Sequence, residues 1–454
     1  MQRAEAPARG ASKVLPHIAT EYEVVAMTLD GLLMNELAGH VRMSYPNARD
    51  RYAELGVDAD AAIDLALETP LSVHCWQADD VIGLETHEEG TDAGGIQATG
   101  NYRGRARNGE EIRADFETAA DLIPGTLRFN LHAMYAETDG AVVDRDELEP
   151  EHFAPWIDWC EQHEWGLDFN PTCFAHPKMR DGMTLSSTDK ATRQFWIDHC
   201  IASRRIADAI AQRLGPGTCN IWIPDGRKDV TADRMGPRER LLEALDEVLA
   251  EDLDVIDTVE SKLFGIGAED YTVGSHEFYL AYAATRGCGL CFDMGHYHPT
   301  EKIADKISAA IQFVSPILLH CSRGVRWDSD HVTRFNDDLR AVCTEAVRSD
   351  RFDDILWATD FFDASINRIA AWVLGERAVR KSLLSALLEP HDLAVVAEYS
   401  GVGHAKLALD ELRSELPFGT IWEELCERAG VPTGIAWLAE IRRYEEEVLS
   451  EREA

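Results

Sequence analysis

Residues 255–293 read VIDTVESKLFGIGAEDYTVGSHEFYLAYAATRGCGLCFD. They contain a short β-branched run, a break with glycine and polar residues, a helical stretch and a second short apolar run. Strands that alternate with helices favour parallel pairing, because a parallel connection crosses over through a segment long enough for a helix. This unit therefore predicts an α/β fold built on a parallel sheet.

The same unit recurs along the chain. Short apolar or β-branched runs occupy residues 70–75, 127–134, 166–169, 218–223, 255–259, 289–292, 317–319 and 355–358. Eight such runs over roughly 290 residues match a closed (β/α)8 TIM barrel better than an open doubly wound sheet. The open sheet stays an alternative, because the pattern alone does not show closure and two of the runs are very short.

The flanks of this pattern differ from it. Residues 1–40 have no clean period, and we expect a poorly ordered N-terminal extension. A helical pattern covers about residues 45–68, and the chain is wholly helical after about residue 365, with helices predicted at 366–374, 377–388, 407–416, 421–426 and 435–449. We therefore predict a barrel catalytic domain at 41–365 and a helical C-terminal region at 366–454 that contributes to oligomer contacts.

The composition is strongly acidic. The chain has 81 acidic and 44 basic residues, a formal net charge of −37. Such a surface repels nucleic acid and anionic membranes, and it disfavours a phosphorylated substrate. It also resembles proteins adapted to high salt, in which self-repulsion is screened. No apolar run reaches the length of a membrane span, and Glu21, Glu23 and Asp30 interrupt the N-terminal stretch, so we expect a soluble cytoplasmic protein.

One pair among the ten cysteines has the spacing of a redox or zinc motif, Cys288-Gly-Leu-Cys291. No second pair of this kind exists in the sequence, and the motif leads directly into a predicted buried strand. We interpret both residues, like the other cysteines, as free thiols that act as small hydrophobic side chains.

Polar and aromatic side chains stand at or just beyond the end of every predicted strand. They are Trp76, His132, Asp168, Asn170, Trp222, Asp225, Glu260, Lys262, Asp293, His296, His320 and Asp360. In a (β/α)8 barrel these ends meet at the face that carries the reactive groups. A single acid at a strand end is often a helix cap, and a single histidine is often a core residue, so the prediction depends on the whole set.

Four of these residues predict a divalent metal site: Glu260, Asp293, His320 and Asp360. Three carboxylates and one imidazole suit Mn²⁺, Mg²⁺, Co²⁺ or Zn²⁺, and the set is too rich in oxygen for a structural zinc built on thiolates. A second ion with open positions for two substrate oxygens is predicted at His296, Asp328 and Asp330, because residues two apart in an extended loop share a face. An ordinary solvated turn is the alternative for Asp328 and Asp330.

Two ions beside Lys262 indicate chemistry on adjacent oxygens of a substrate. A cation that chelates a hydroxyl and a carbonyl polarises the carbonyl, and an ammonium group hydrogen-bonds the carbonyl oxygen as it gains charge. This arrangement fits a 1,2-hydride shift, and it also fits proton abstraction through an enediol. Lys262 is one of only nine lysines, which weakens its interpretation as one more surface charge.

Nine motifs together resemble the L-rhamnose isomerase family in order and spacing. They are SVHCWQ (72–77), GGIQATGNY (94–102), GLDFNP (166–171), FWIDHC (195–200), NIWIPDG (220–226), VESKLFGIG (259–267), HPT (298–300), VRWDSDH (325–331) and DFFDASINR (360–368). The resemblance runs from about residue 45 to 450. Gly324 departs from it, since proline is common there, and the N-terminal extension has no counterpart.

The resemblance implies reversible conversion of L-rhamnose to L-rhamnulose by a homotetramer with two divalent ions per subunit, Mn²⁺ preferred and Zn²⁺, Co²⁺ or Mg²⁺ usable. It implies a structural ion at Glu260, Asp293, His320 and Asp360 and a catalytic ion at His296, Asp328 and Asp330. It further implies a sugar pocket of Trp76, His132, Trp222, Lys262 and Phe169. The catalytic residues implied are Lys262, Asp360 and His132.

Three other functions stay open at this point. A related barrel isomerase would act mainly on L-mannose, L-lyxose or D-allose, because one methyl group in an apolar pocket is worth only about 1 to 3 kcal/mol. A metal-dependent phosphoesterase is disfavoured by the acidic surface. A non-catalytic sugar-binding barrel would keep Glu260 and Asp293 but would not need Lys262 or the pair Asp328 and Asp330.

Overall fold

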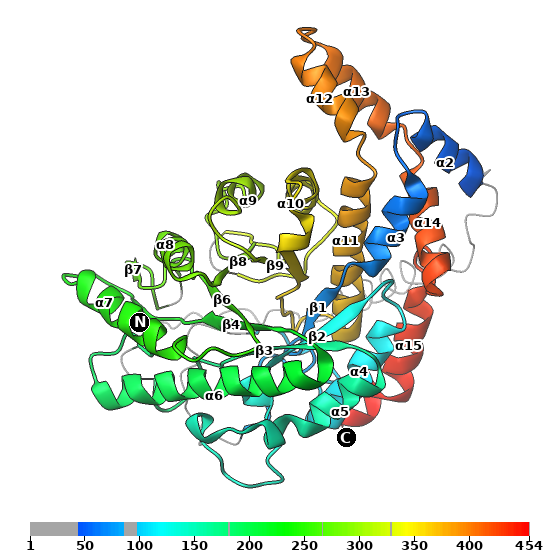
Figure 1. Cartoon of the computed structure of the whole chain (residues 1–454). Coiled ribbons are helices and arrows are strands. Elements are labelled where there is room, and N and C mark those ends of the chain that lie inside the picture. Colours follow the sequence, from blue (N-terminus) through cyan, green and yellow to red (C-terminus); the bar gives the residue numbers. More distant parts are fainter. Residues whose placement is uncertain (1–43, 86–97, 180–181, 266, 327–328, 454) are drawn as a thin grey trace, which may run out of the picture.

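A computed structural model describes residues 44–85, 98–179, 182–265, 267–326 and 329–453 (Figure 1). Eight parallel strands form a closed barrel in the order β1, β10, β9, β8, β6, β4, β3, β2. Their bounds are β1 (Leu71–His74), β2 (Leu127–His132), β3 (Gly166–Asn170), β4 (Thr218–Trp222), β6 (Ile256–Glu260), β8 (Gly289–Asp293), β9 (Ile317–His320) and β10 (Ile355–Ala358). β1 pairs with both β2 and β10, so the predicted barrel is confirmed and the open sheet was wrong.

Every predicted strand is present, with ends that differ by at most two residues from the prediction. The remaining strands, β5 (Gly226–Arg227) and β7 (Tyr271–Thr272), form a small antiparallel ribbon outside the barrel. Strand side chains alternate between the barrel interior and the helix layer.

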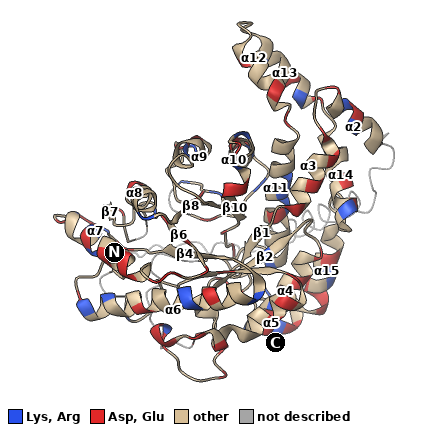
Figure 2. Cartoon of the chain, in the orientation of Figure 1, with Lys and Arg blue, Asp and Glu red and all other residues tan. Residues whose placement is uncertain are grey.

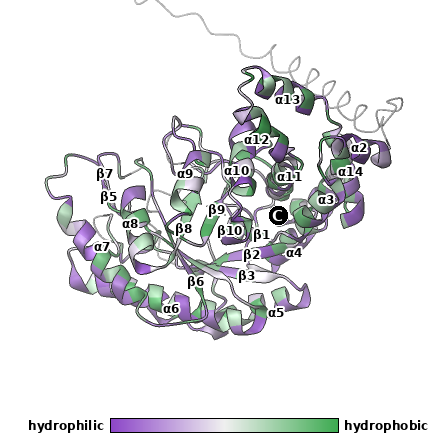
Figure 3. Ribbon diagram, turned by 45° about the horizontal axis from the view of Figure 1, so that its top comes forward, coloured by the Kyte–Doolittle hydropathy of each residue, from purple (hydrophilic) through white to green (hydrophobic). Residues whose placement is uncertain are grey.

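Eight helices pack around the strands: α4 (Gly109–Ala120), α5 (Ala154–Gln162), α6 (Lys190–Leu214), α7 (Met235–Val248), α8 (His276–Arg286), α9 (Ala304–Ala310), α10 (Asp337–Arg348) and α11 (Arg368–Leu387). Residues with short polar side chains cap the N-termini of several of these helices. The side chains of Asn108, Asp189 and Asn336 accept hydrogen bonds from backbone N–H groups in the first turns of α4, α6 and α10. Figure 3 shows that these helices mix hydrophilic and hydrophobic residues, as expected for helices with one buried face.

The remaining helices lie to one side of the barrel. They are α2 (Tyr45–Ala53), α3 (Ala59–Glu68), α12 (His391–Tyr399), α13 (Ala405–Ser414), α14 (Phe418–Ala429) and α15 (Trp437–Glu447). Short 3₁₀ turns complete the described elements: η1 (Ala133–Tyr135), η2 (Arg145–Glu147), η3 (Pro150–Phe153), η4 (Phe352–Asp354) and η5 (Leu449–Glu453). The helices α12 and α13 project away from the barrel (Figures 1 and 3).

The helical flanks differ from the prediction in detail. The stretch 45–68 is two helices, because Gly56 between them adopts a φ of +80°, which only glycine takes readily. The two helices predicted at 366–374 and 377–388 form the single helix α11, and α12 was not predicted. α11 contacts α10, α4 and β1, so it serves as the eighth helix of the barrel. The predicted boundary at residue 365 therefore falls just before a barrel helix, and residues 1–40 lie outside the described residues.

A second core joins both ends of the described chain. Residues of α2, α3 and α14 pack with Leu384 of α11 and with Leu388, which directly follows it. The interior of the barrel is different, with a small apolar group of Cys291, Leu318 and Ala358 among buried polar side chains. Among the described residues, no helix combines the length and apolar character needed to cross a bilayer.

Candidate metal centre

Four predicted ligands converge at the carboxyl ends of neighbouring strands. Glu260, Asp293 and His320 are the last residues of β6, β8 and β9, and Asp360 lies two residues beyond β10. One donor atom from each lies within 4.8 Å of the others. His320 Nδ1 is 3.3 Å from Glu260 Oε2, 3.3 Å from Asp360 Oδ2 and 3.6 Å from Asp293 Oδ2. The strand-end pattern thus brings these four side chains to one point, as the sequence predicts.

All four side chains are buried, and several of their polar atoms lack hydrogen-bond partners within the described part of the chain. These atoms are both ring nitrogens of His320, Oδ2 of Asp293 and Oδ1 of Asp360. Burial, together with the charges of Asp293 and Glu260, raises the pKa of Asp360 to about 6 against the lowering effect of His320. Unpartnered buried polar atoms are costly, and a divalent cation would satisfy one atom from each of these side chains at once. The donor set therefore fits an oxygen-preferring cation.

Two hydrogen bonds fix the orientation of the Asp293 carboxylate. Its Oδ1 accepts hydrogen bonds of 2.6 Å from the backbone N–H of Gly295 and from Ser322 Oγ. This leaves Oδ2 directed at the cluster. Gly295 must be small, because a Cβ there would lie 2.2 Å from Asp330 Oδ1. Such supporting hydrogen bonds fix the orientation of metal ligands.

A second group lies beside the first and shares Asp293 with it. Donor atoms of Asp293, His296 and Asp330 lie within 4.8 Å of one another. His296 Nε2 is 3.5 Å from Asp330 Oδ1, and its Nδ1 is 2.9 Å from Glu260 Oε1. Burial, followed by the charge of Asp293, raises the pKa of Asp330 well above its ordinary value. Asp328, the third predicted ligand of this group, lies outside the described residues.

A cavity of about 360 Å³ lies over both groups. Its lining includes the predicted residues Trp76, His132, Trp222 and Lys262 together with Glu260, His296, His320, Asp330 and Asp360. Trp76 stacks on His132 with ring centroids 4.3 Å apart. Lys262 is only 4% exposed, and its Nζ lies 5.8 Å from the centroid of the Trp222 ring. A buried ammonium group, aromatic walls and an acidic floor are suited to an uncharged polyol.

Protonation states differ within this cavity. Burial, together with the charge of the neighbouring His320, lowers the pKa of His132 to about 3. His132 is therefore neutral over the working pH range. Its Nδ1 lacks a hydrogen-bond partner within the described part of the chain, which leaves it available to a ligand.

Phe169 does not line the cavity, in contrast to its predicted role as a substrate contact. It packs edge-on against Phe153 in the helix layer, with ring centroids 4.9 Å apart. The physical reason is strand alternation: its neighbours Asp168 and Asn170 face the barrel interior, so Phe169 faces outward. Phe174, in the loop after β3, lines the cavity instead.

Two acids at predicted strand ends have structural roles. Asp168 pairs with Arg128 at 2.8 Å, toward the opposite end of the barrel interior from the cluster. Asp225 accepts hydrogen bonds from the backbone and hydroxyl groups of Thr184 and Ser186. Neither lines the cavity over the cluster.

Sequence reasoning did not single out several other residues that line the cavity, among them Phe174, Asn220 and Phe362. Asn220 and Phe362 lie within the quoted motifs NIWIPDG and DFFDASINR, which was the available signal for them. Phe174 lies just beyond the motif GLDFNP, in a loop whose course the pattern does not predict.

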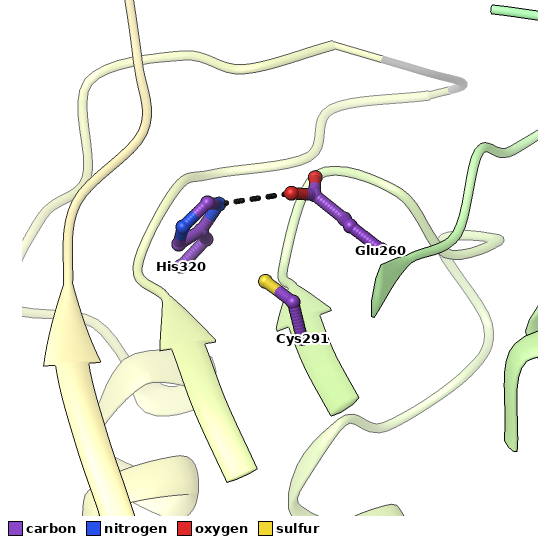
Figure 4. A group of neighbouring side chains, drawn as sticks. All are labelled: Glu260, Cys291 and His320. Carbon is purple, nitrogen blue, oxygen red and sulfur yellow. Dashed lines mark ion pairs between the residues drawn. The ribbon is translucent and has the colours of Figure 1, made fainter. Parts of the chain in front are cut away.

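The cysteine pair contains one residue near the cluster. All ten cysteines are free, and most are buried, as expected. Cys291 has its Sγ within 4.8 Å of donor atoms of Glu260 and His320 (Figure 4), whereas Cys288 joins no such group among the described residues. The pair therefore does not act as a two-cysteine zinc motif.

Comparison with known proteins gives consistent matches. The family model described as L-rhamnose isomerase (RhaA) matches residues 39–452. Relatives named L-rhamnose isomerase from Escherichia coli O17:K52:H18 (strain UMN026 / ExPEC) and Salmonella paratyphi B (strain ATCC BAA-1250 / SPB7) are each 55% identical over 409 residues, which cover 89% of this chain and 97% of the relative. A solved D-tagatose 3-epimerase-like protein is 13% identical over 57% of this chain and 89% of its own, with a TM-score of 0.40, too low to support an inference.

Proposed function

The chain belongs to the L-rhamnose isomerase family, and from this membership we propose that it interconverts L-rhamnose and L-rhamnulose in the cavity over the buried acids. It is an aldose–ketose isomerase. The observation that carries the assignment to this cavity is the convergence of Glu260, Asp293, His320 and Asp360, with unpartnered buried atoms, beneath aromatic walls. The family and the donor chemistry together support a metal-dependent reaction.

Each subunit holds two divalent cations in this proposal, with Mn²⁺ preferred and Zn²⁺, Co²⁺ or Mg²⁺ usable. Glu260, Asp293, His320 and Asp360 hold the structural ion, and His296, Asp328 and Asp330 hold the catalytic ion. The oxygen-rich donor sets support hard cations. When bound, the cations polarise the sugar carbonyl and lower the pKa of the adjacent hydroxyl.

The side chains around the cavity have different roles in the reaction. Lys262 donates a hydrogen bond to the carbonyl oxygen as that oxygen gains negative charge. His132 is neutral and hydrogen-bonds a sugar hydroxyl through Nδ1. Trp76 and Trp222 exclude water. This favours a 1,2-hydride shift, in which hydrogen moves with its electron pair from C2 to C1 and the proton of the C2 hydroxyl passes to O1, over an enediol that exchanges protons with solvent. Asp360 lines the cavity and would help to hold the structural ion.

The proposal extends to the state of the protein in the cell. It is a cytoplasmic homotetramer whose region 366–454 supplies oligomer contacts, and the catalytic domain, predicted at 41–365, extends through α11 to include the eighth helix of the barrel. Leu393, Val396 and Tyr399 on the projecting helix α12 are exposed, which supports a role in contacts. The net charge of −37 supports adaptation to high salt.

The decisive experiment uses the full-length chain stripped of metal with a chelator. L-rhamnose is added with and without Mn²⁺, in low salt and in about 2 M KCl, and the ketose formed is measured. We expect ketose only with a divalent cation and a higher kcat/KM for L-rhamnose than for L-mannose, L-lyxose or D-allose. Absence of ketose with every divalent cation tested would overturn the proposal, and a higher kcat/KM for another aldose would reassign the substrate.

A further inference from the structure

Two loops at the carboxyl ends of the strands meet beside the cavity. The first follows β1 and carries Trp76, and the second follows β10 and carries Phe362; both rings line the cavity. The rings meet edge to face, with centroids 6.0 Å apart and an interplanar angle of 77°. The register of the two strands runs to Ser72 and Ala358, so both rings lie beyond it. Their separation therefore depends on contacts between the loops.

The side chain of Gln77 joins the two loops directly. Its Nε2 donates a hydrogen bond of 3.0 Å to the backbone carbonyl of Asp363, and its Oε1 accepts one of 2.9 Å from the backbone N–H of the same residue. These two bonds engage both backbone polar groups of Asp363, as a hydrogen-bonded residue on a neighbouring strand would. Gln77 is fully buried and is not part of the cavity lining, so it lies behind the wall.

The hydrogen-bonded pair lies one residue beyond the aromatic pair. Gln77 directly follows Trp76, and Asp363 directly follows Phe362. Movement of Asp363 away from Gln77 would therefore carry Phe362 away from Trp76. Such movement is costly, because a buried donor and a buried acceptor would lose their partners. The geometry of these two hydrogen bonds thus sets how closely the two rings approach each other.

A strained turn holds the first loop in a defined position. Asp80 and Val81 adopt left-handed φ angles of +63° and +61°, a conformation that is costly for residues other than glycine. The N–H of Val81 donates a hydrogen bond of 3.1 Å to the carbonyl of Trp76. The buried guanidinium of Arg368 donates two hydrogen bonds of 2.7 Å to the carboxylate of Asp80. Strain persists where such contacts over-determine it, so the place of Trp76 is fixed before any ligand binds.

We propose that Gln77 is a positioning residue for the sugar. By locking the loop after β1 to the loop after β10, it sets the spacing of Trp76 and Phe362 and thereby the affinity of the cavity for an aldose. The inference rests on the proposed function, because it takes the cavity as the sugar site. Aromatic walls contact the ground state and the transition state alike, so the effect falls on KM rather than on kcat. Gln77 belongs to neither group of candidate ligands, so cation affinity is retained.

The test replaces Gln77 by methionine, which keeps the length of the side chain and removes both hydrogen bonds. We expect KM for L-rhamnose to rise about tenfold, with kcat and Mn²⁺ affinity within about threefold of the wild type. Gln77→Asn is a second variant that retains both polar groups. It is one methylene shorter and reaches Asp363 only if the loops shift, so its KM also rises. Ketose formation gives kcat and KM, and calorimetry gives the cation affinity.

A spectroscopic measurement follows Trp76 in the absence of sugar. The full-length chain is labelled with fluorinated tryptophan and loaded with diamagnetic Mg²⁺, and the fluorine resonance of Trp76 is assigned from its loss in Trp76→Phe. This resonance should shift in both Gln77 variants, because the ring of Phe362 moves relative to it. The resonance of Trp422, in the core formed by α2, α3 and α14, should stay in place and reports that the variant is folded.

Asn367→Ala is the matched control. Asn367 ends the same loop at α11, and its side chain also donates one hydrogen bond, to Glu445, and accepts one, from the N–H of Ala370. It is buried but is not part of the cavity lining. This variant should lower stability and leave KM and the Trp76 resonance unchanged. Equal rises of KM in Asn367→Ala and Gln77→Met would assign the effect to general loosening of the loop and overturn the inference.

Failure of the inference and failure of the proposed function give different results. A wild-type KM in both Gln77 variants, or a Trp76 resonance that does not move in them, would overturn the positioning role. Either result with a wild type that forms ketose defeats the positioning role alone. A shifted Trp76 resonance in the variants of a protein that forms no ketose with any cation defeats only the isomerase assignment.

Discussion

The side-chain amide of Asn220 donates a hydrogen bond of 2.5 Å from Nδ2 to Glu260 Oε2. Its Oδ1 accepts a hydrogen bond of 2.8 Å from Thr258 Oγ1. The hydroxyl of Thr258 therefore fixes which end of the amide faces the carboxylate. Asn220 orients Glu260 toward the cluster without belonging to either candidate group of ligands.

Replacement of Asn220 by alanine is expected to weaken Mn²⁺ binding by about 10- to 100-fold, because the carboxylate of Glu260 loses its orienting donor. Isothermal titration calorimetry on the metal-free chain measures this. Asn130→Ala is the matched control, since Asn130 is also buried in the barrel interior but bonds to Asn170. Equal losses of affinity in both variants would contradict the prediction.

Lys262→Met is expected to lower kcat by about 100- to 1,000-fold, because a donor to the developing charge on the carbonyl oxygen is lost. Calorimetry should show Mn²⁺ affinity unchanged within a factor of a few. Lys306→Met is the control, because Lys306 is on α9 and forms an ion pair with Glu301 outside the cavity. A rise in KM with kcat intact would show that Lys262 binds the sugar only in its ground state.

Phe174 and Phe169 are expected to respond differently to truncation. Phe174→Ala removes part of the cavity wall and is expected to raise KM for L-rhamnose about tenfold, in line with about 1 to 3 kcal/mol for an apolar contact. Phe169→Ala leaves a void in the helix layer and is expected to lower the free energy of unfolding by about 3 to 5 kcal/mol. Steady-state kinetics and urea unfolding of both variants test this, and a raised KM in Phe169→Ala would restore its predicted role.

Glu376 is expected to make stability depend on pH. Burial raises its pKa to about 8, although the Thr359 hydroxyl and the Arg380 guanidinium lower it. A group with a raised folded-state pKa contributes stability below its unfolded value near 4.5, and this contribution is lost as pH rises through about 8. Glu376→Gln removes that loss of stability, which is on the order of 5 kcal/mol.

The measurement for Glu376 is the urea midpoint of the metal-free wild type and of Glu376→Gln at pH 5, 7 and 9. The urea midpoint of Glu376→Gln should rise relative to that of the wild type as pH rises. Glu345→Gln serves as a control for the loss of one negative charge on the neighbouring helix α10. Parallel pH dependence of all three proteins would mean that Glu376 does not titrate as proposed.

Salt is expected to stabilise the fold through screening. Figure 2 shows acidic residues on α3, α4, α14 and α15, and the net charge of −37 opposes a compact state. The screening length falls from about 10 Å at 0.1 M to about 3 Å at 1 M salt. The melting temperature should therefore rise steeply up to about 1 M KCl and then flatten; a melting temperature independent of salt over that range would count against high-salt adaptation.

The sequence by itself determined the eight strands and the metal-binding character of one barrel face. Runs of β-branched residues are a local signal, and parallel strands place their carboxyl ends on one edge, so Glu260, Asp293, His320 and Asp360 were predictable as a group. His296, three residues after Asp293, and Asp330, on an extended loop with Asp328, were predicted as ligands of a second ion next to this group.

Only the tertiary structure decided which of several equally polar strand-end residues serve the site. Asp168 and Asp225 read like Asp293 in the sequence, yet their partners Arg128 and Thr184 engage them elsewhere. Arg128 lies 40 residues from Asp168 along the chain, and Thr184 lies 41 residues from Asp225. Asn220 is likewise 40 residues from Glu260. The local sequence pattern predicts the type of each side chain and the strand face on which it lies. Its hydrogen-bonding partner depends on how distant elements pack together, which the local pattern does not predict.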